Sequence, residues 1–420
     1  MLKKALDYIY VVSGNGLSRA LALVNSVIIA RLLGPAAFGA FSIFFSVMML
    51  IKQLPYAFDI TYVRFAKVND SANEKNEFLK ATVLLKSGYA LALLLICYPA
   101  SIFVASNLFN KPELSGLLTI AVVAGLPPIF LLTISAVYQE RERFLAFAIL
   151  NSIYTFFVFA TLLFICYRKK ETGLGNIASL YLGVSIIIGI PSFFYLLKRI
   201  KNIFLIHTAT FKTAFSFGKW ILGVSCVYYI FNELAMLLLP VFLEFEAIGI
   251  YSAGSRLAMS VFVISGALAG VFLPRASTAL TSKSAFREYL KESAAATAAI
   301  SLFIVLLFAL SPALIKLLYG AEFLPSASVM RILLAGIFFA VIYTPLSYLF
   351  YTLGDSRTRF LLESLKLLIV IALLFVLAPK SGITGVAVAI SIGLVFNTAL
   401  STVILAAKIK TYFNRKKEQQ

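Results

Sequence analysis

The chain has 420 residues, of which 61% are hydrophobic and 13% are charged. This composition excludes a soluble fold, because a soluble protein needs more polar side chains to cover its surface. The formal net charge is +19, from 37 Lys and Arg against 18 Asp and Glu. Apolar stretches of about 20 residues, long enough to span a bilayer as a helix, recur along almost the whole chain. The sequence therefore predicts an all-α polytopic membrane protein.

Charged and Gly/Pro-rich breaks divide the apolar sequence into about twelve predicted transmembrane helices. The first of them follows Met1-Leu2-Lys3-Lys4 and shows no A-x-A-like cleavage site, so we expect a retained span and not a signal peptide. The predicted spans are residues 9-31, 37-58, 81-104, 114-138, 144-167, 174-197, 217-243, 247-273, 293-318, 324-351, 359-378 and 383-407.

Lys and Arg are concentrated in alternate connectors. With the N-terminus in the cytoplasm, the inner segments hold most of these cations, and the two longest connectors, Asp59–Lys80 and Pro274–Glu292, also lie inside. We therefore expect both termini to be cytoplasmic. The positive charge then reflects membrane orientation and attraction to anionic lipids, so no nucleic-acid partner is expected. Short outer connectors also argue against a polymerase or ligase acting at the outer face.

Three short motifs recur at an offset close to half the chain length. FGAFS at Phe38–Ser42 matches IGIYS at Ile248–Ser252, and similar pairs are FLK at 78-80 with YLK at 289-291, and LFNKPEL at 108-114 with LYGAEFL at 318-324. Two halves of six spans enter the membrane in the same orientation, so a pseudo-two-fold axis along the membrane normal is expected. The predicted parts are an N-terminal six-helix lobe over 1-200, a cytoplasmic linker over 201-215, a C-terminal six-helix lobe over 216-410 and a basic cytoplasmic tail over 411-420.

Transporters built from such repeats bind their substrate between the halves and expose it to each side in turn. Transport is therefore the leading hypothesis for function. Duplication for structure alone is the alternative.

Several cations lie inside predicted spans, where a charge costs roughly 2.5 to 3.5 kcal/mol unless it is paired or faces water. Lys86 and Lys219 lie near the cytoplasmic ends of their spans and are expected to reach the interface. Lys366 follows Glu363 by three residues, so we expect an ion pair on one helix face. Arg19 and Arg256 instead lie about 18 and 13 Å from the outer ends of their spans, too deep to reach the interface easily.

The deep cations predict a site for an anion. Arg19 belongs to a polar stripe that suits either a wet cavity or a tight helix contact, made of Asn15, Ser18, Arg19, Ala22, Asn25 and Ser26. In the second span, Lys52 shares a helix face with Tyr56 and Asp59. The predicted substrate-binding residues are Arg19, Lys52, Arg256 and Asn15. Guanidinium groups bind phosphate oxygens in pairs, so a phosphate or pyrophosphate group is the expected ligand.

Two carboxylates are candidates for coupling transport to an ion gradient. Glu233 lies about 15 Å from the outer end of its span, at the depth of Arg256, so an ion pair between them explains both residues equally well. Asp59 is the second candidate, and either would take up H⁺ or Na⁺. Cys97, Cys166 and Cys226 are far apart in apolar stretches, so neither a disulfide nor a metal site is predicted, and no cofactor is expected.

The stretch ARLLGPAAFGAFSIFFSV at 30-47, the two six-span halves and the cationic spans resemble the polysaccharide transporter family. This is the Wzx-type O-antigen flippase branch of the multidrug, oligosaccharidyl-lipid and polysaccharide exporter superfamily. The resemblance implies a flippase, not an enzyme, that moves undecaprenyl-pyrophosphate-linked oligosaccharide repeat units from the cytoplasmic to the periplasmic leaflet of the bacterial inner membrane. Membrane lipids, a polysaccharide polymerase and a chain-length regulator are the further partners it suggests.

The resemblance also extends to particular residues. Related lipid II flippases have cavity-lining cations on helices one, two and eight, and the matching positions by helix are Arg19, Lys52 and Arg256. Lys52 stands where such proteins usually have Arg, and this chain lacks the two additional C-terminal spans typical of lipid II flippases. The alternatives are a multidrug or other lipid-linked precursor exporter of the same superfamily and, from another class, a membrane glycan polymerase or ligase.

Overall fold

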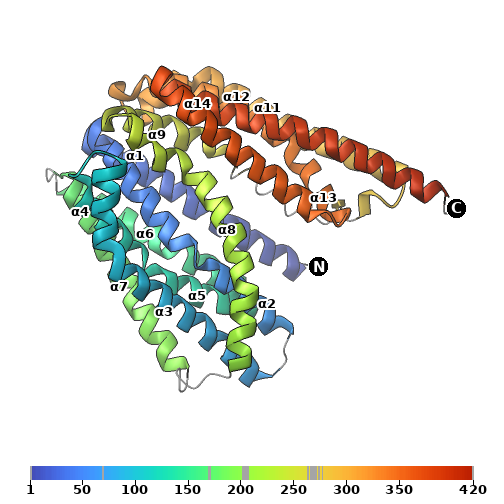
Figure 1. The fold of residues 1–420 in the computed structure, drawn as a ribbon, viewed down its shortest axis with the longest axis horizontal. Coiled ribbons are helices and arrows are strands. Elements are labelled where there is room, and N and C mark those ends of the chain that lie inside the picture. Colours follow the sequence, from blue (N-terminus) through green and yellow to red (C-terminus); the bar gives the residue numbers. More distant parts are fainter. Residues whose placement is uncertain are drawn as a thin grey trace. The chain divides into compact units, whose positions relative to one another are not determined.

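A computed structural model describes residues 2–68, 71–168, 172–200, 208–262, 264, 272, 275–276 and 278–418. Within these ranges there is no β-strand, and nine helices are long and apolar enough to cross a membrane. The predicted all-α polytopic fold is therefore confirmed. The count of twelve spans stays a prediction, because span 247-273 runs beyond the described residues. The chain divides into two compact units, Met1–Gly249 and Ile250–Gln420 (Figure 1).

The first unit is a helical bundle in which α1 packs against α4, α6 and α8, while α2 packs against α3, α5 and α8. The predicted linker at 201-215 stays a prediction. A core of buried side chains joins α2, α3, α5 and α7 around Tyr62, Phe78 and Ile129. The helices of this unit are α1 (Leu2–Gln53), α2 (Tyr56–Val68), α3 (Ala72–Phe103), α4 (Leu114–Gly125), α5 (Pro128–Glu140), α6 (Phe144–Tyr167), α7 (Leu174–Arg199), α8 (Thr208–Phe242) and the start of α9 (Phe245–Met259). A π-helical turn, Val104–Leu108, extends α3.

The predicted Gly-Pro turn divides α1 into two helices. Gly34 has φ 70° and ψ 174°, a backbone conformation open almost only to glycine. Pro35 follows at the start of the next helix, where its fixed φ is suitable and its missing N–H costs little. The structure therefore separates the first two predicted spans at the Gly34-Pro35 turn, as the sequence predicted.

Glycines of the repeated motif lie against each other in the first unit. A Cβ on Gly39 of α1 would lie 1.8 Å from the carbonyl oxygen of Phe245, and a Cβ on Gly249 of α9 would lie 1.9 Å from the carbonyl oxygen of Pro35. Gly39 and Gly249 occupy the same place in FGAFS and IGIYS. The contact is thus reciprocal, and the absence of side chains lets the two backbones approach closely.

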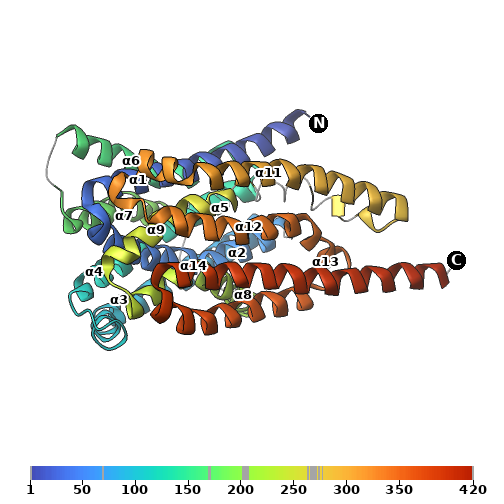
Figure 2. The same ribbon diagram turned by 90° about the horizontal axis from the view of Figure 1, so that it is seen from above.

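In the second unit, α12 lies between α11 and α14 (Figure 2). A buried cluster that includes Phe272, Tyr289, Phe350 and Leu405 forms its core. The helices are the end of α9, α11 (Lys283–Leu318), the 3₁₀ turn η2 (Ala321–Phe323), α12 (Ser326–Ser347), α13 (Leu349–Thr352) and α14 (Ser356–Glu418).

α14 folds back on itself at Gly382, which has φ 55° and ψ −137°. This break lies between the predicted spans 359-378 and 383-407. Asp355, just before α14, accepts a hydrogen bond from the Thr358 N–H at 3.1 Å and forms an ion pair with Lys408 in the second half of the hairpin. The hydrogen bonds from Lys408 and Thr358 lower the pKa of Asp355 to about 2, so this link is charged at neutral pH.

Two predicted spans have different limits in the structure. Span 37-58 is interrupted at Leu54–Pro55, because proline supplies no N–H to the helix, and α2 then continues to Val68. The prediction that a connector begins at Asp59 is therefore wrong, since Asp59 is buried within α2. Span 114-138 is divided into α4 and α5 at Leu126–Pro127 for the same reason.

Candidate functional site

The polar stripe of α1 is a tight contact with α6. The Ser18 hydroxyl lies 3.3 Å from the Thr155 hydroxyl and 3.5 Å from the Asn151 carbonyl oxygen. Asn25 donates from Nδ2 to the Thr155 carbonyl oxygen at 3.2 Å. Of the two readings that the sequence left open, helix packing therefore accounts for Ser18 and Asn25. The Asn15 side chain is outside the described part of the structure, so its place in a site stays a prediction.

Arg19 directly follows Ser18 in α1. Its side chain is exposed, and it forms no hydrogen bond or ion pair with the part of the protein that the structure describes. The neighbouring hydrogen bond of Ser18 fixes the helix position from which the guanidinium extends. Arg19 is thus available to a ligand from outside the protein chain.

Lys52 lies in the last turn of α1, partly buried against α6. Its Nζ is 4.6 Å from the centre of the Tyr154 ring, a cation–π distance. No carboxylate among the described residues forms an ion pair with it. The C-terminal end of the helix also favours a cation here through its dipole. Lys52 is therefore a partly buried cation without an acidic partner in the described structure.

The structure brings Arg19 and Lys52 to one level of the first unit. Ser18, next to Arg19, contacts Asn151 and Thr155, and Lys52 contacts Tyr154, all within little more than one turn of α6. Counted along the helices from the turn at Gly34, Arg19 and Lys52 lie roughly 22 and 27 Å away, which agrees with this placement. We refer to α6 residues 151-155, with Arg19 and Lys52, as the cationic level.

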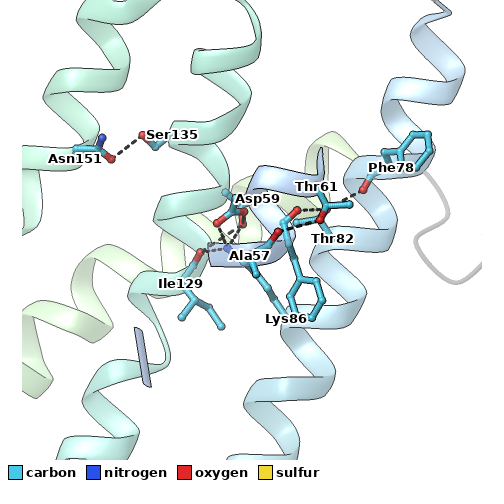
Figure 3. A network of polar contacts seen from close by, with 11 residues as sticks. Ala57, Asp59, Thr61, Phe78, Thr82, Lys86, Ile129, Ser135 and Asn151 are labelled. Carbon is cyan, nitrogen blue, oxygen red and sulfur yellow. Dashed lines mark hydrogen bonds and ion pairs between the residues drawn. The ribbon is translucent and has the colours of Figure 1, made fainter. Parts of the chain in front are cut away.

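A fully buried ion pair lies beside this level (Figure 3). Lys86 of α3 donates to the Asp59 carboxylate of α2, to the Ile129 carbonyl oxygen at 2.9 Å and to the Thr133 hydroxyl at 2.8 Å. Thr133 of α5 donates in turn to Asp59 Oδ1 at 2.9 Å. All three N–H donors of the ammonium are satisfied, so the network closes on itself and joins three helices.

Further polar contacts surround the ion pair and connect it to the cationic level. Thr61 and Thr82 donate to main-chain oxygens on α2 and α3 close to the pair. Ser135 of α5 donates to the Asn151 side chain of α6 at 2.8 Å (Figure 3). Thr133 thus connects α5 to the buried pair, and Ser135 connects α5 to the cationic level.

The buried pair corrects the interpretation of Lys86 and bears on that of Asp59. The prediction that Lys86 reaches the membrane interface is wrong, because its side chain is fully buried and held by Asp59, Ile129 and Thr133. Asp59 is neutralised by Lys86, so uptake of H⁺ or Na⁺ there would have to break the pair, and its coupling role stays a prediction. The sequence signal for the pair was a Lys within an apolar run and an Asp in the neighbouring span, without a short spacing to connect them.

The remaining predicted residues are Arg256, Glu233 and the pair of Lys366 with Glu363. In the second unit, Arg256 of α9 donates from Nε to the Ser252 hydroxyl at 3.1 Å. Glu233 lies on α8 in the first unit, and the predicted pair of Glu233 with Arg256 stays a prediction. The predicted pair of Lys366 with Glu363 is confirmed.

The long apolar helices are those of a multi-pass membrane protein. A family model described as "Polysaccharide biosynthesis protein" matches residues 5–280, and the chain belongs to this family. A Shigella flexneri protein described as "Putative O-antigen transporter" is 23% identical over 421 residues, which cover 96% of this chain and 97% of that protein.

Two solved structures share the fold. The lipid II flippase MurJ in an inward closed conformation matches with a TM-score of 0.75 and 20% identity, over 94% of this chain and 86% of that chain. An inward-facing multidrug resistance MATE family transporter of the MOP superfamily matches with a TM-score of 0.73 and 14% identity, over 94% and 96% of the two chains. The Shigella flexneri protein, the flippase and the MATE transporter are all named as transport proteins, in agreement with the expectation of a transporter.

Proposed function

We propose that this protein is a flippase for polysaccharide precursors. It translocates undecaprenyl-pyrophosphate-linked oligosaccharide repeat units, of O-antigen or another surface polysaccharide, from the cytoplasmic to the periplasmic leaflet by alternating access. It lies in the bacterial inner membrane with both termini in the cytoplasm. The family membership and the O-antigen transporter relative support this class of substrate. A polysaccharide polymerase and a chain-length regulator are the protein partners that this role would require nearby.

The observation that carries the proposal is the difference between Lys86 and the two cations of the cationic level. Lys86 is fully buried and its donors are used within the protein. Arg19 is exposed, Lys52 is partly exposed, and neither has a carboxylate partner within the described ranges. Unpaired cations within apolar spans are costly and typically mark a functional site, and an anion such as pyrophosphate would pair with them. Arg256 of the second unit, which the sequence predicts as a further substrate-binding residue, stays a prediction.

Lys52→Met and Arg19→Ala are each expected to lower surface glycan at least about tenfold, because each loses a charge-assisted hydrogen bond to phosphate worth about 1.5 to 3 kcal/mol. Arg256→Ala is expected to act in the same direction. Surface glycan is measured by gel and glycan staining in a host that depends on this protein, with the amount of membrane-inserted protein measured by immunoblot. Lys380→Met, at an exposed position next to the Gly382 turn, is the control and should leave glycan unchanged.

Normal glycan in an Arg19→Ala/Lys52→Met double variant, at normal protein level, would overturn the pyrophosphate site. The second candidate function is multidrug export, which the MATE-like fold favours. It predicts drug sensitivity on deletion with glycan intact. The unpaired cations argue against it, because a cationic drug requires an acidic site.

A further inference from the structure

Tyr154 is the one aromatic side chain shown in contact with the Lys52 ammonium among the described residues. Only 3% of its surface is exposed. Its hydroxyl lies 3.1 Å from the Ser185 hydroxyl of α7 and donates to the Met48 sulfur of α1 at 3.8 Å. The hydroxyl therefore contacts α1 and α7, while the face of the buried ring lies against the Lys52 ammonium.

Resting on the proposed function, we infer that Tyr154 is a positioning residue, which holds the Lys52 ammonium in place for a phosphate group while leaving its N–H donors free. A carboxylate partner would fix Lys52 equally well, but it would use those donors and cancel the charge, as Asp59 does for Lys86. An aromatic face attracts a cation through its quadrupole and accepts no conventional hydrogen bond. The ring thus lowers the cost of placing the charge without removing its ability to bind an anion.

Contacts made by α1 and by α6 hold the helix backbones on which Lys52 and Tyr154 lie. Tyr89 of α3 donates to the Ile51 carbonyl oxygen at 3.0 Å, which fixes the last turn of α1 next to Lys52. On α6, Asn151 and Thr155 flank Tyr154 and contact Ser18, the neighbour of Arg19. The same turn of α6 therefore contacts both Lys52 and the neighbour of Arg19. A pyrophosphate that binds both cations would depend on the spacing that this turn maintains.

The test measures binding and not transport. Purified full-length protein in neutral detergent is treated with an amine-acylating reagent, and labelling of Lys52 is followed by mass spectrometry as inorganic pyrophosphate is added. The variants are Tyr154→Met and Tyr154→Leu, which remove the ring, and Tyr154→Phe, which keeps it. Tyr181→Leu is the matched control, because Tyr181 is also 3% exposed in the same unit and packs against Phe41, Phe44 and Phe45.

The pyrophosphate concentration that protects half of Lys52 is expected to rise about tenfold in both ringless variants, within the range of a desolvated cation–π contact. Tyr154→Phe and Tyr181→Leu should stay within about twofold of the unmodified protein. Unchanged protection in the ringless variants, or an equal rise in Tyr154→Phe, would overturn the role of the ring. A tenfold rise in Tyr181→Leu as well would show a general packing effect and would overturn it too.

Two further arms separate this inference from the proposed function. No protection of Lys52 in the unmodified protein by pyrophosphate or by a short-chain polyprenyl pyrophosphate would overturn the proposed function itself. Equal protection by phosphatidylglycerol would identify a bulk lipid headgroup as the anion, again against the proposed function. Protection in the unmodified protein that persists in Tyr154→Met would instead contradict only the positioning role.

Discussion

Asp59→Ala is expected to lower the free energy of unfolding by about 3 to 5 kcal/mol, the cost of leaving one partner of a buried ion pair uncompensated. Without the carboxylate, Lys86 would either hold its charge with only the Ile129 carbonyl and the Thr133 hydroxyl as acceptors or give up its proton, and both states cost free energy. Both side chains of the pair are completely buried, so water cannot replace the lost partner. The measurement is thermal unfolding of the purified protein in detergent, supported by its yield in the membrane.

The double variant Asp59→Leu/Lys86→Met tests the physical cause. Replacing both charges by apolar side chains of similar size removes the uncompensated charge, so stability should return to near the original value. Lys67→Met is the matched control, because the Lys67–Glu142 pair has an N–O distance of 2.6 Å but its side chains are 45% and 67% exposed. Lys67→Met should lower the free energy of unfolding by less than about 1 kcal/mol. An Asp59→Ala protein as stable as the original would contradict the assignment, as would a double variant no better than the single one.

The same double variant separates a structural role of Asp59 from ion coupling. If the pair only joins α2, α3 and α5, surface glycan returns together with stability. If Asp59 takes up H⁺ or Na⁺ during transport, the double variant is stable but inactive. The closed hydrogen-bond network favours the first result.

Gly39→Ala and Gly249→Ala are each expected to lower the free energy of unfolding by about 3 kcal/mol, at the upper end for overpacking. The added Cβ would lie within 2 Å of the Phe245 or Pro35 carbonyl oxygen, and a backbone oxygen cannot rotate away as a side chain can. The helices α1 and α9 would have to move apart at the contact between the two repeated motifs. Thermal unfolding in detergent is again the measurement.

Gly88→Ala in α3 and Gly116→Ala in α4 are the controls for this pair. Nothing lies within 4 Å of a Cβ at either position. Alanine is the better helix former by about 0.5 to 1 kcal/mol, so these changes should leave stability unchanged or raise it. Gly39→Ala or Gly249→Ala variants that behave like these controls would show that the close approach of α1 and α9 is not maintained in the protein.

Hydropathy and backbone chemistry made much of the fold predictable. The apolar runs predicted helices, and Gly34 with Pro35 predicted the break in α1, because a glycine-only conformation and a missing N–H are local properties. The pairing of Lys366 with Glu363 was predictable for the same reason, since both residues lie on one helix three positions apart. The division of span 37-58 at Pro55 was not predicted, although a proline within a helix is a known signal for a break.

The sequence by itself determined that this is a polytopic helical protein with cations at membrane depth, since both follow from composition and from position within an apolar run. Only the tertiary structure decided which cations are already paired. Lys86 and Lys52 both lie within apolar stretches of the sequence. In the structure, Lys86 donates hydrogen bonds to Asp59 and Thr133 on two other helices, whereas Lys52 contacts the ring of Tyr154. Such contacts depend on the rotation and depth of separate helices, and local periodicity contains neither.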